Sequence, residues 1–118
     1  MEMAANIIIV IVGLLHVYFL VLEMFLWTKP QGLKTFRNTP EKAEITKVLA
    51  ANQGLYNGFL AAGLFWGVLL GAGGFGVKVF FLSCVVIAGA YGAISVSKRI
   101  LYIQSAPAAL GLALVCAA

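Results

Sequence analysis

Long apolar runs alternate with one long polar connection along this chain. The runs occupy residues 7–27, 48–70, 77–96 and 100–118. About 20 mostly apolar residues are enough for a helix to cross a bilayer. The connection at residues 28–47 is too short to form an independent domain. The pattern therefore predicts an all-α fold, an integral membrane four-helix bundle in which residues 1–118 form one transmembrane domain. The expected helices lie at about 4–27, 40–70, 77–97 and 100–118.

The composition excludes a water-soluble enzyme of this size. Of the 118 residues, 63% are hydrophobic and only 10% are charged, and the mean hydropathy is +1.03. A small domain leaves much of its surface in contact with solvent, so it could not bury this much apolar side chain. The leading segment MEMAAN contains no Lys or Arg, and we therefore expect the first run to be a retained helix and not a signal peptide.

The basic residues predict how the chain is oriented in the membrane. Seven of them fall in the first and third connections: Lys29, Lys34, Arg37, Lys42, Lys47, Lys98 and Arg99. Against these, the opposite side has only Lys78. Because Lys and Arg in short loops stay in the cytoplasm, both termini are expected outside. This topology also accounts for the basic pI, so no nucleic-acid partner is expected.

The start of the second helix carries a recognisable cap. Thr39 is expected to be the N-cap and Pro40 the first helical residue, followed by Glu41 and Glu44 near the positive end of the helix dipole. The helix is thus predicted to begin before the apolar run itself.

Two ionisable residues, His16 and Glu23, lie in the first apolar run. Such groups are costly in a bilayer unless they are paired or hydrated, which makes them functional candidates. They are seven residues apart and share one stripe of the helix, about 10 Å apart along its axis. Glu23 is expected near the cytoplasmic end, and His16 is expected near the middle of the bilayer.

Further polar side chains are predicted at the depth of Glu23. The second helix enters the membrane through the segment NQGLYNGF, and the third and fourth helices each add one polar residue at that level. The candidates for ligand binding or proton relay are His16, Glu23, Asn52, Gln53, Tyr56, Asn57, Tyr91 and Gln104. Buried amides need partners. The alternative is that these groups only hold the helices together.

The chain resembles a family of small bacterial membrane proteins, catalogued as domain of unknown function 1304. The resemblance rests on the first helix with His16, Glu23 and Trp27, on NQGLYNGF, on AGAYGA, and on Gln104 followed by Pro107. It covers nearly the whole chain. It implies a four-helix integral protein of the cytoplasmic membrane, and no catalytic residue follows from it.

Three functions are consistent with these residues. The chain could bind or transport a small molecule or ion at the polar level, with Glu23 as its main acidic group. It could instead be an accessory subunit whose polar residues fix helix register. A third reading is a membrane enzyme acting on a lipid or quinone, with Glu23 as general acid or base.

Few cofactors or partners are indicated by the sequence. One histidine and one glutamate are too few ligands for a metal, and no cofactor is expected. Membrane lipids, a hydrophobic or small polar ligand and further copies of the chain are the expected partners. Cys84 and Cys116 are expected to be free thiols in lipid, with a disulfide as the alternative.

Overall fold

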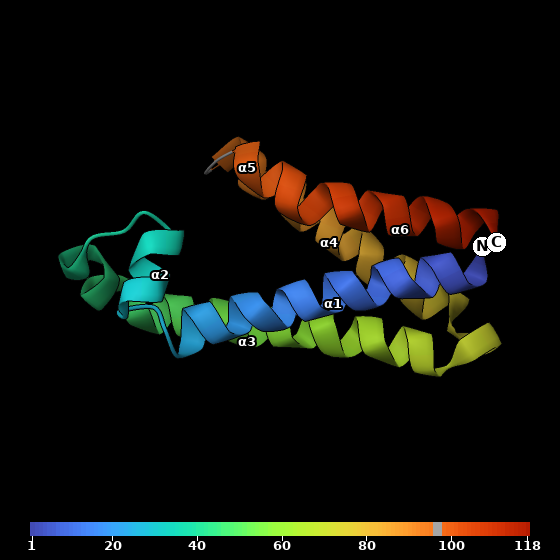
Figure 1. The fold of residues 1–118 in the computed structure, drawn as a ribbon, viewed down its shortest axis with the longest axis horizontal. Coiled ribbons are helices and arrows are strands. Elements are labelled where there is room, and N and C mark those ends of the chain that lie inside the picture. Colours follow the sequence, from blue (N-terminus) through green and yellow to red (C-terminus); the bar gives the residue numbers. More distant parts are fainter. Residues whose placement is uncertain (96–97) are drawn as a thin grey trace. The chain divides into compact units, whose positions relative to one another are not determined.

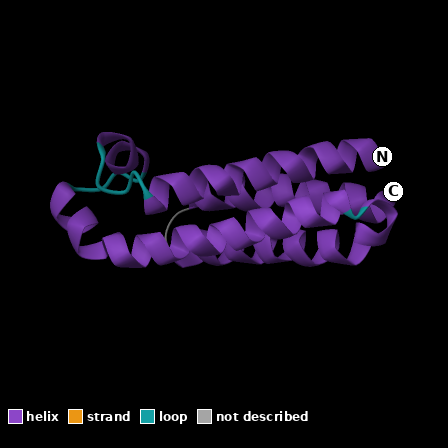
Figure 2. Cartoon of the chain, turned by 90° about the horizontal axis from the view of Figure 1, so that it is seen from below, coloured by secondary structure: helices purple, strands orange, loops and turns teal. Residues whose placement is uncertain are grey.

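The computed structural model describes residues 1–95 and 98–118, which are helical over most of their length (Figures 1 and 2). In chain order the elements are α1 (Glu2–Met24), α2 (Pro30–Thr35), α3 (Pro40–Leu69), η1 (Gly71–Gly74), α4 (Phe75–Ser95), α5 (Lys98–Ile100), η2 (Leu101–Ser105) and α6 (Ala106–Ala117). This confirms the all-α class for the part of the chain described. The predicted end of the third helix, at residues 96–97, lies outside the described residues.

Three helical segments of the described chain are long and apolar enough to cross a membrane. They are Glu2–Met24, Gly71–Ser95 and Lys98–Ala117. At 30 residues, α3 is the longest helix, yet it does not belong to this set. The polar residues of NQGLYNGF lie in its middle and reduce its apolar character. The fourth crossing at residues 48–70 therefore stays a prediction.

The chain divides into two compact units. Unit 1 comprises residues 1–14 and 60–118, and unit 2 comprises residues 15–59. Both α1 and α3 contribute to each unit, because each of these helices continues through the boundary.

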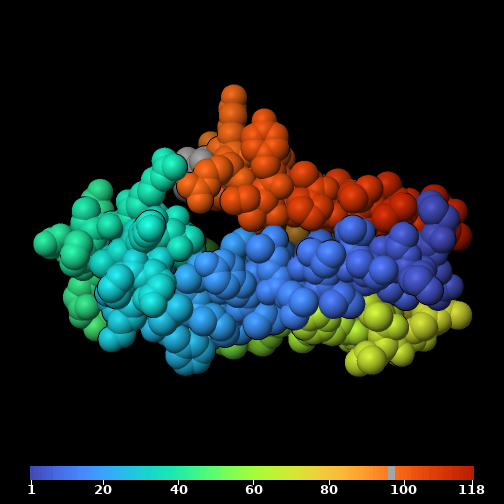
Figure 3. Space-filling view, in the orientation of Figure 1, coloured from blue at the N-terminus to red at the C-terminus, as the bar shows by residue number. Residues whose placement is uncertain are grey.

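Unit 1 has an apolar core. Ala5, Ile9 and Val12 of α1 follow the spacing of one helical face and are buried. They pack in one cluster with buried residues of α3, α4 and α6, namely Leu64, Leu82, Val85, Ala108 and Val115. Figure 3 shows the first residues of the chain, in blue, lying against the C-terminal helix in red.

The outer surface of unit 1 is also apolar. Ile7, Ile11 and Leu14 of α1 are each more than half exposed, and Ile87 and Ile94 of α4 are exposed to 67% and 87%. An extensive apolar surface of this kind is unusual on a soluble monomer and is expected where a protein meets lipid. The burial pattern thus agrees with the membrane class inferred from composition.

The last predicted helix, at residues 100–118, is not one regular α-helix. It consists of α5, the π-helical segment η2 and then α6. Pro107 lies at the start of α6 and has no N–H to donate to the carbonyl one turn earlier. A change of helical register next to such a residue is a known way to accommodate the missing hydrogen bond.

Unit 2 contains the end of α1, the short α2 and the first two thirds of α3. The predicted cap is present: α3 begins at Pro40, and the Lys42 N–H donates to Thr39 Oγ1 at 3.3 Å. The Trp27 indole Nε1–H donates to Thr46 Oγ1 of α3 at 3.1 Å. The Trp27 ring also packs on Phe36, with 4.9 Å between centroids. Trp27 therefore links three parts of unit 2.

Replacing Trp27 by phenylalanine is expected to lower the free energy of unfolding by about 1 kcal/mol, since the variant loses the hydrogen bond to Thr46 and keeps an aromatic ring. Thermal unfolding in detergent, followed by circular dichroism, measures this. Trp66→Phe is the matched control, because Trp66 is 54% exposed. Equal stability of the two variants would contradict a stabilising role for the indole N–H.

Candidate functional site

Glu23 lies in the last turn of α1, which ends at Met24. Its side chain is partly buried. The last turn of α1 contains no basic residue. A carboxylate at this end of a helix faces the negative end of the helix dipole. The helix dipole therefore disfavours a carboxylate at this position, and the presence of Glu23 is not explained by a stabilising effect on α1.

The partner of Glu23 is Asn57 of α3. The Asn57 amide Nδ2–H donates to Glu23 Oε1, with 2.5 Å between the heavy atoms. An amide N–H that donates to a carboxylate makes a charge-assisted hydrogen bond, which is stronger than one between neutral groups. It joins residues that are 34 positions apart in sequence, and both belong to unit 2. Asn57 is one of the polar side chains that the sequence places at the depth of Glu23.

Gly54 allows α1 and α3 to approach closely enough for this contact. A Cβ atom placed on Gly54 would lie 2.6 Å from Met24 Cγ and 3.2 Å from both Glu23 Cβ and the Leu20 carbonyl oxygen. Gly54 is one turn before Asn57, so the two residues share a face of α3. The glycine thus places the backbone of α1 against the face that carries the amide.

The site has the chemistry of a carboxylate with a neutral partner. Asn57 supplies hydrogen-bond donors without a positive charge, so the acid is not neutralised by this contact. In the described part of the chain the one ion pair joins the exposed Lys47 and Glu44. A partly buried carboxylate held in place by an amide can accept a proton, a small cation or an N–H or O–H donor of a ligand.

The other polar candidates of α3 are not joined to this pair. Asn52, Gln53 and Tyr56 are exposed, and the Tyr56 side chain is 61% accessible. Tyr56 makes a ring contact with Phe59, 6.1 Å between centroids. Asn52 and Tyr56 lie away from the face that carries Gly54 and Asn57, and Gln53, one turn before Asn57, lies at the edge of that face and is exposed.

The candidates beyond α3 have different surroundings. His16 is fully buried, and its ring meets the Phe19 ring edge-on at 5.5 Å between centroids. Tyr91 and Gln104 belong to unit 1, where Tyr91 is 71% exposed and Gln104 is partly buried. Within unit 2, the structure thus brings Glu23 and Asn57 together.

Two polar residues of unit 1 were not among the predicted candidates. Lys78, the basic residue expected on the side opposite the cytoplasm, is only 5% exposed. Asn6 Oδ1 is buried and has no hydrogen-bond partner among the described residues. The sequence did mark both positions, because Lys78 is a lysine inside the third apolar run and Asn6 is an amide directly before the first run. The cysteines are both free thiols, partly buried at Cys84 and exposed at Cys116.

Comparison with known proteins places these residues in a family. The chain matches the family described as "Protein of unknown function (DUF1304)" over residues 10–116. The chain belongs to this family. Within the DUF1304 match lie Glu23, Gly54 and Asn57, whereas Glu2 and Asn6 precede it.

This DUF1304 chain is similar to a curated relative along most of the length of both proteins. It is the uncharacterized protein YpaA of Lactococcus lactis subsp. lactis (strain IL1403), which is 27% identical over 104 residues. The similar region covers 86% of this chain and 87% of the relative. No solved structure matches the chain.

Proposed function

We propose that the chain is a bacterial inner-membrane protein that crosses the membrane four times, with both ends outside the cytoplasm. At 30 residues, α3 has a length of roughly 45 Å, which is more than a bilayer core requires. The two ends of the chain lie beside each other in unit 1 (Figure 1), as an even number of crossings requires. The basic residues at positions 29–47 and 98–99 favour the cytoplasm for the connections.

In this proposal the protein binds and transports a small cation, of which the proton is the simplest, through Glu23. The observation that carries the proposal is the hydrogen bond from Asn57 to a partly buried carboxylate that has no basic residue in its helical turn. Acidic residues within membrane spans are costly and commonly serve ion or proton pathways. His16, seven residues earlier on α1, would extend the path into the membrane.

The proposal includes a homo-oligomer. Four helices with a tightly packed core enclose little space for a pathway. The exposed apolar surface of the single chain leaves room for contacts with further copies as well as with lipid. A path for an ion would then run where copies meet, with one Glu23 supplied by each chain.

Ion flux into vesicles tests the role of Glu23. The full chain is reconstituted into liposomes with a trapped pH-sensitive dye, and a potassium diffusion potential drives proton entry. Wild type should exceed protein-free liposomes about tenfold, and Glu23→Gln should reduce the rate to that of protein-free liposomes, because the amide cannot carry a proton. Glu41→Gln, an exposed acid in the first turn of α3, is the control and should retain wild-type flux.

The same experiment separates transport from an accessory role. The close packing of α1 on Gly54 favours the accessory function, since it shows that this region also holds helices together. If wild type conducts no protons, sodium or potassium above protein-free liposomes, or if Glu23→Gln conducts as well as wild type, the transport proposal is wrong. Reduced thermal stability of Glu23→Gln without any flux phenotype would then support the accessory role.

A further inference from the structure

A buried lysine lies near the beginning of α4 in unit 1. Lys78 is 5% exposed, and its Cγ passes so close to Gly67 that a Cβ there would be 2.9 Å away. Among the described residues, no carboxylate forms a salt bridge with it. The buried unpartnered side-chain atoms of the described chain do not include Lys78 Nζ, so the stem is buried while the charged end reaches the surface. The ammonium is therefore available to an acceptor from outside the chain.

Lys78 lines a cavity of about 180 Å³. Glu2 of α1, Phe75 of α4 and Val115 of α6 also line it. The cavity thus presents one cationic and one anionic side chain that do not pair with each other. A ligand that carries both charges, close together, matches such a cavity better than a simple anion does.

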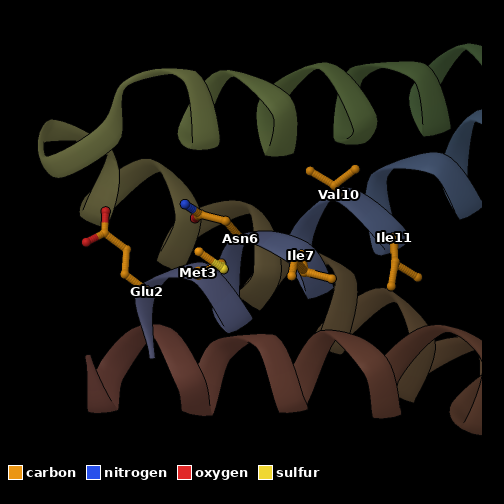
Figure 4. Close-up of a pocket in the computed structure, with 6 residues that line it drawn as sticks. All are labelled: Glu2, Met3, Asn6, Ile7, Val10 and Ile11. Carbon is orange, nitrogen blue, oxygen red and sulfur yellow. The ribbon is translucent and has the colours of Figure 1, made fainter.

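A larger groove on α1 begins at the same acid (Figure 4). Its volume is about 620 Å³, and its lining starts with Glu2 and Asn6 and continues with the apolar side chains of Ile7, Val10 and Ile11. Asn6 Oδ1 is buried here without a hydrogen-bond donor among the described residues. The groove therefore has a carboxylate and an unsatisfied amide oxygen at one end and an apolar surface along the rest.

Both hollows lie at the ends of the candidate membrane spans. Glu2 and Gly71 begin two of these spans, and the third ends at Ala117. Glu2 and Gly71 line the smaller cavity, together with Ala118, the next residue after that last span. From Glu2 to Ile11 the groove follows α1 for roughly 14 Å. The charged groups are thus at the depth of lipid headgroups, and the apolar groove extends to the depth of the acyl chains.

We propose that this end of unit 1 binds an aminophospholipid, with a phosphate and a primary ammonium in one headgroup. The phosphate accepts hydrogen bonds from Lys78. The ammonium donates to Glu2 and to Asn6 Oδ1. One acyl chain lies along Ile7, Val10 and Ile11. A choline headgroup has no N–H to donate, and a glycerol headgroup has no positive charge for Glu2, so both fit less well.

Lipid binding to the intact protein tests this site independently of Glu23. Native mass spectrometry of the detergent-solubilised chain measures binding of dioleoyl phosphatidylethanolamine, phosphatidylcholine and phosphatidylglycerol. We expect the ethanolamine lipid to bind about tenfold more tightly than the other two, as one or two charge-assisted hydrogen bonds would give. Lys78→Met should abolish this preference, and Lys98→Met, an exposed lysine of α5, should leave it unchanged.

Further arms distinguish the headgroup contacts from general packing. If Lys78→Met fails to fold, Asn6→Leu provides the test, because it removes the acceptor at the helix start and should reduce the ethanolamine preference severalfold. Soluble O-phosphoethanolamine should not displace the lipid, since it lacks acyl chains. Equal binding of all three lipids, full displacement by O-phosphoethanolamine, or an unchanged preference in Asn6→Leu would overturn the proposal.

Discussion

Replacing Gly89 by valine is expected to lower the free energy of unfolding by about 3 kcal/mol. A Cβ at this position of α4 would lie 2.1 Å from Ser105 Oγ and 2.9 Å from the Ser105 backbone nitrogen. Overpacking a close helix contact costs about 1–3 kcal/mol. Ser105 is buried, and its hydroxyl donates to the Val86 carbonyl oxygen at 2.8 Å. Displacing Ser105 breaks this bond at a cost of about 1 kcal/mol more.

The measurement is reversible unfolding in mixed micelles, followed by the loss of helical circular dichroism. Gly76→Val is the matched control, since Gly76 lies on the same helix and an added Cβ there meets nothing within 4 Å. This control introduces the same side chain into the same helix without the steric contact. A loss of stability in Gly89→Val no larger than in Gly76→Val would show that α4 and η2 are not in close contact at this point.

The helical class of this chain could be predicted from its hydrophobic pattern because each apolar run is long enough to form a membrane helix. The cap at Thr39 was also predictable, since the residues that form it are local. The π-helical segment η2 was harder to foresee. Pro107 indicates that a hydrogen bond is lost, yet whether the helix kinks, bulges or shifts register depends on its packing against α4.

The candidate site was predicted in part, and the helix geometry explains the rest. Depth follows from the rise per residue, and it placed Glu23 near the level of NQGLYNGF. Which residue meets Glu23 depends on the direction of each side chain. Ala50, Gly54 and Asn57 follow one face of α3, and the first two are buried. Successive helical residues turn by 100°, so Asn52 lies on the opposite side of α3, whereas Gln53, one turn before Asn57, lies at the edge of that face and is exposed.

The small residues of α3 therefore indicate which face of the helix packs against α1, and the polar residues alone do not. Ala50 and Gly54 mark the side on which another backbone approaches, and Asn57 is the polar residue that continues this line. The burial of Lys78 was not predictable for a related reason. A basic residue at the start of an apolar run is usually interpreted as a charge at the membrane surface. The burial of Lys78 depends on its contact with Gly67 of α3, and the pattern within α4 does not predict a contact with another helix.

Exchanging Asn57 for aspartate is expected to lower the free energy of unfolding by about 3 kcal/mol at neutral pH. The two side chains have nearly the same shape, so packing is retained while the Nδ2 donor to Glu23 Oε1 becomes a second carboxylate oxygen. Two like charges 4 Å apart repel by about 4 kcal/mol at an effective dielectric constant of 20. Acid should relieve the loss, because a protonated carboxyl can again donate to its neighbour. The variant should therefore gain stability relative to wild type as the pH falls.

The exchange of both partners provides the decisive control for this pair. In Glu23→Gln combined with Asn57→Asp, an amide again faces a carboxylate with the roles of the helices reversed, and most of the lost stability should return. Unfolding in mixed micelles at neutral and acidic pH measures all three variants. If the hydrogen bond between α1 and α3 organises unit 2, the coupling energy of the double-mutant cycle is at least about 1 kcal/mol. Strictly additive effects, or an Asn57→Asp variant as stable as wild type at neutral pH, would show that Glu23 and Asn57 do not interact in the folded protein.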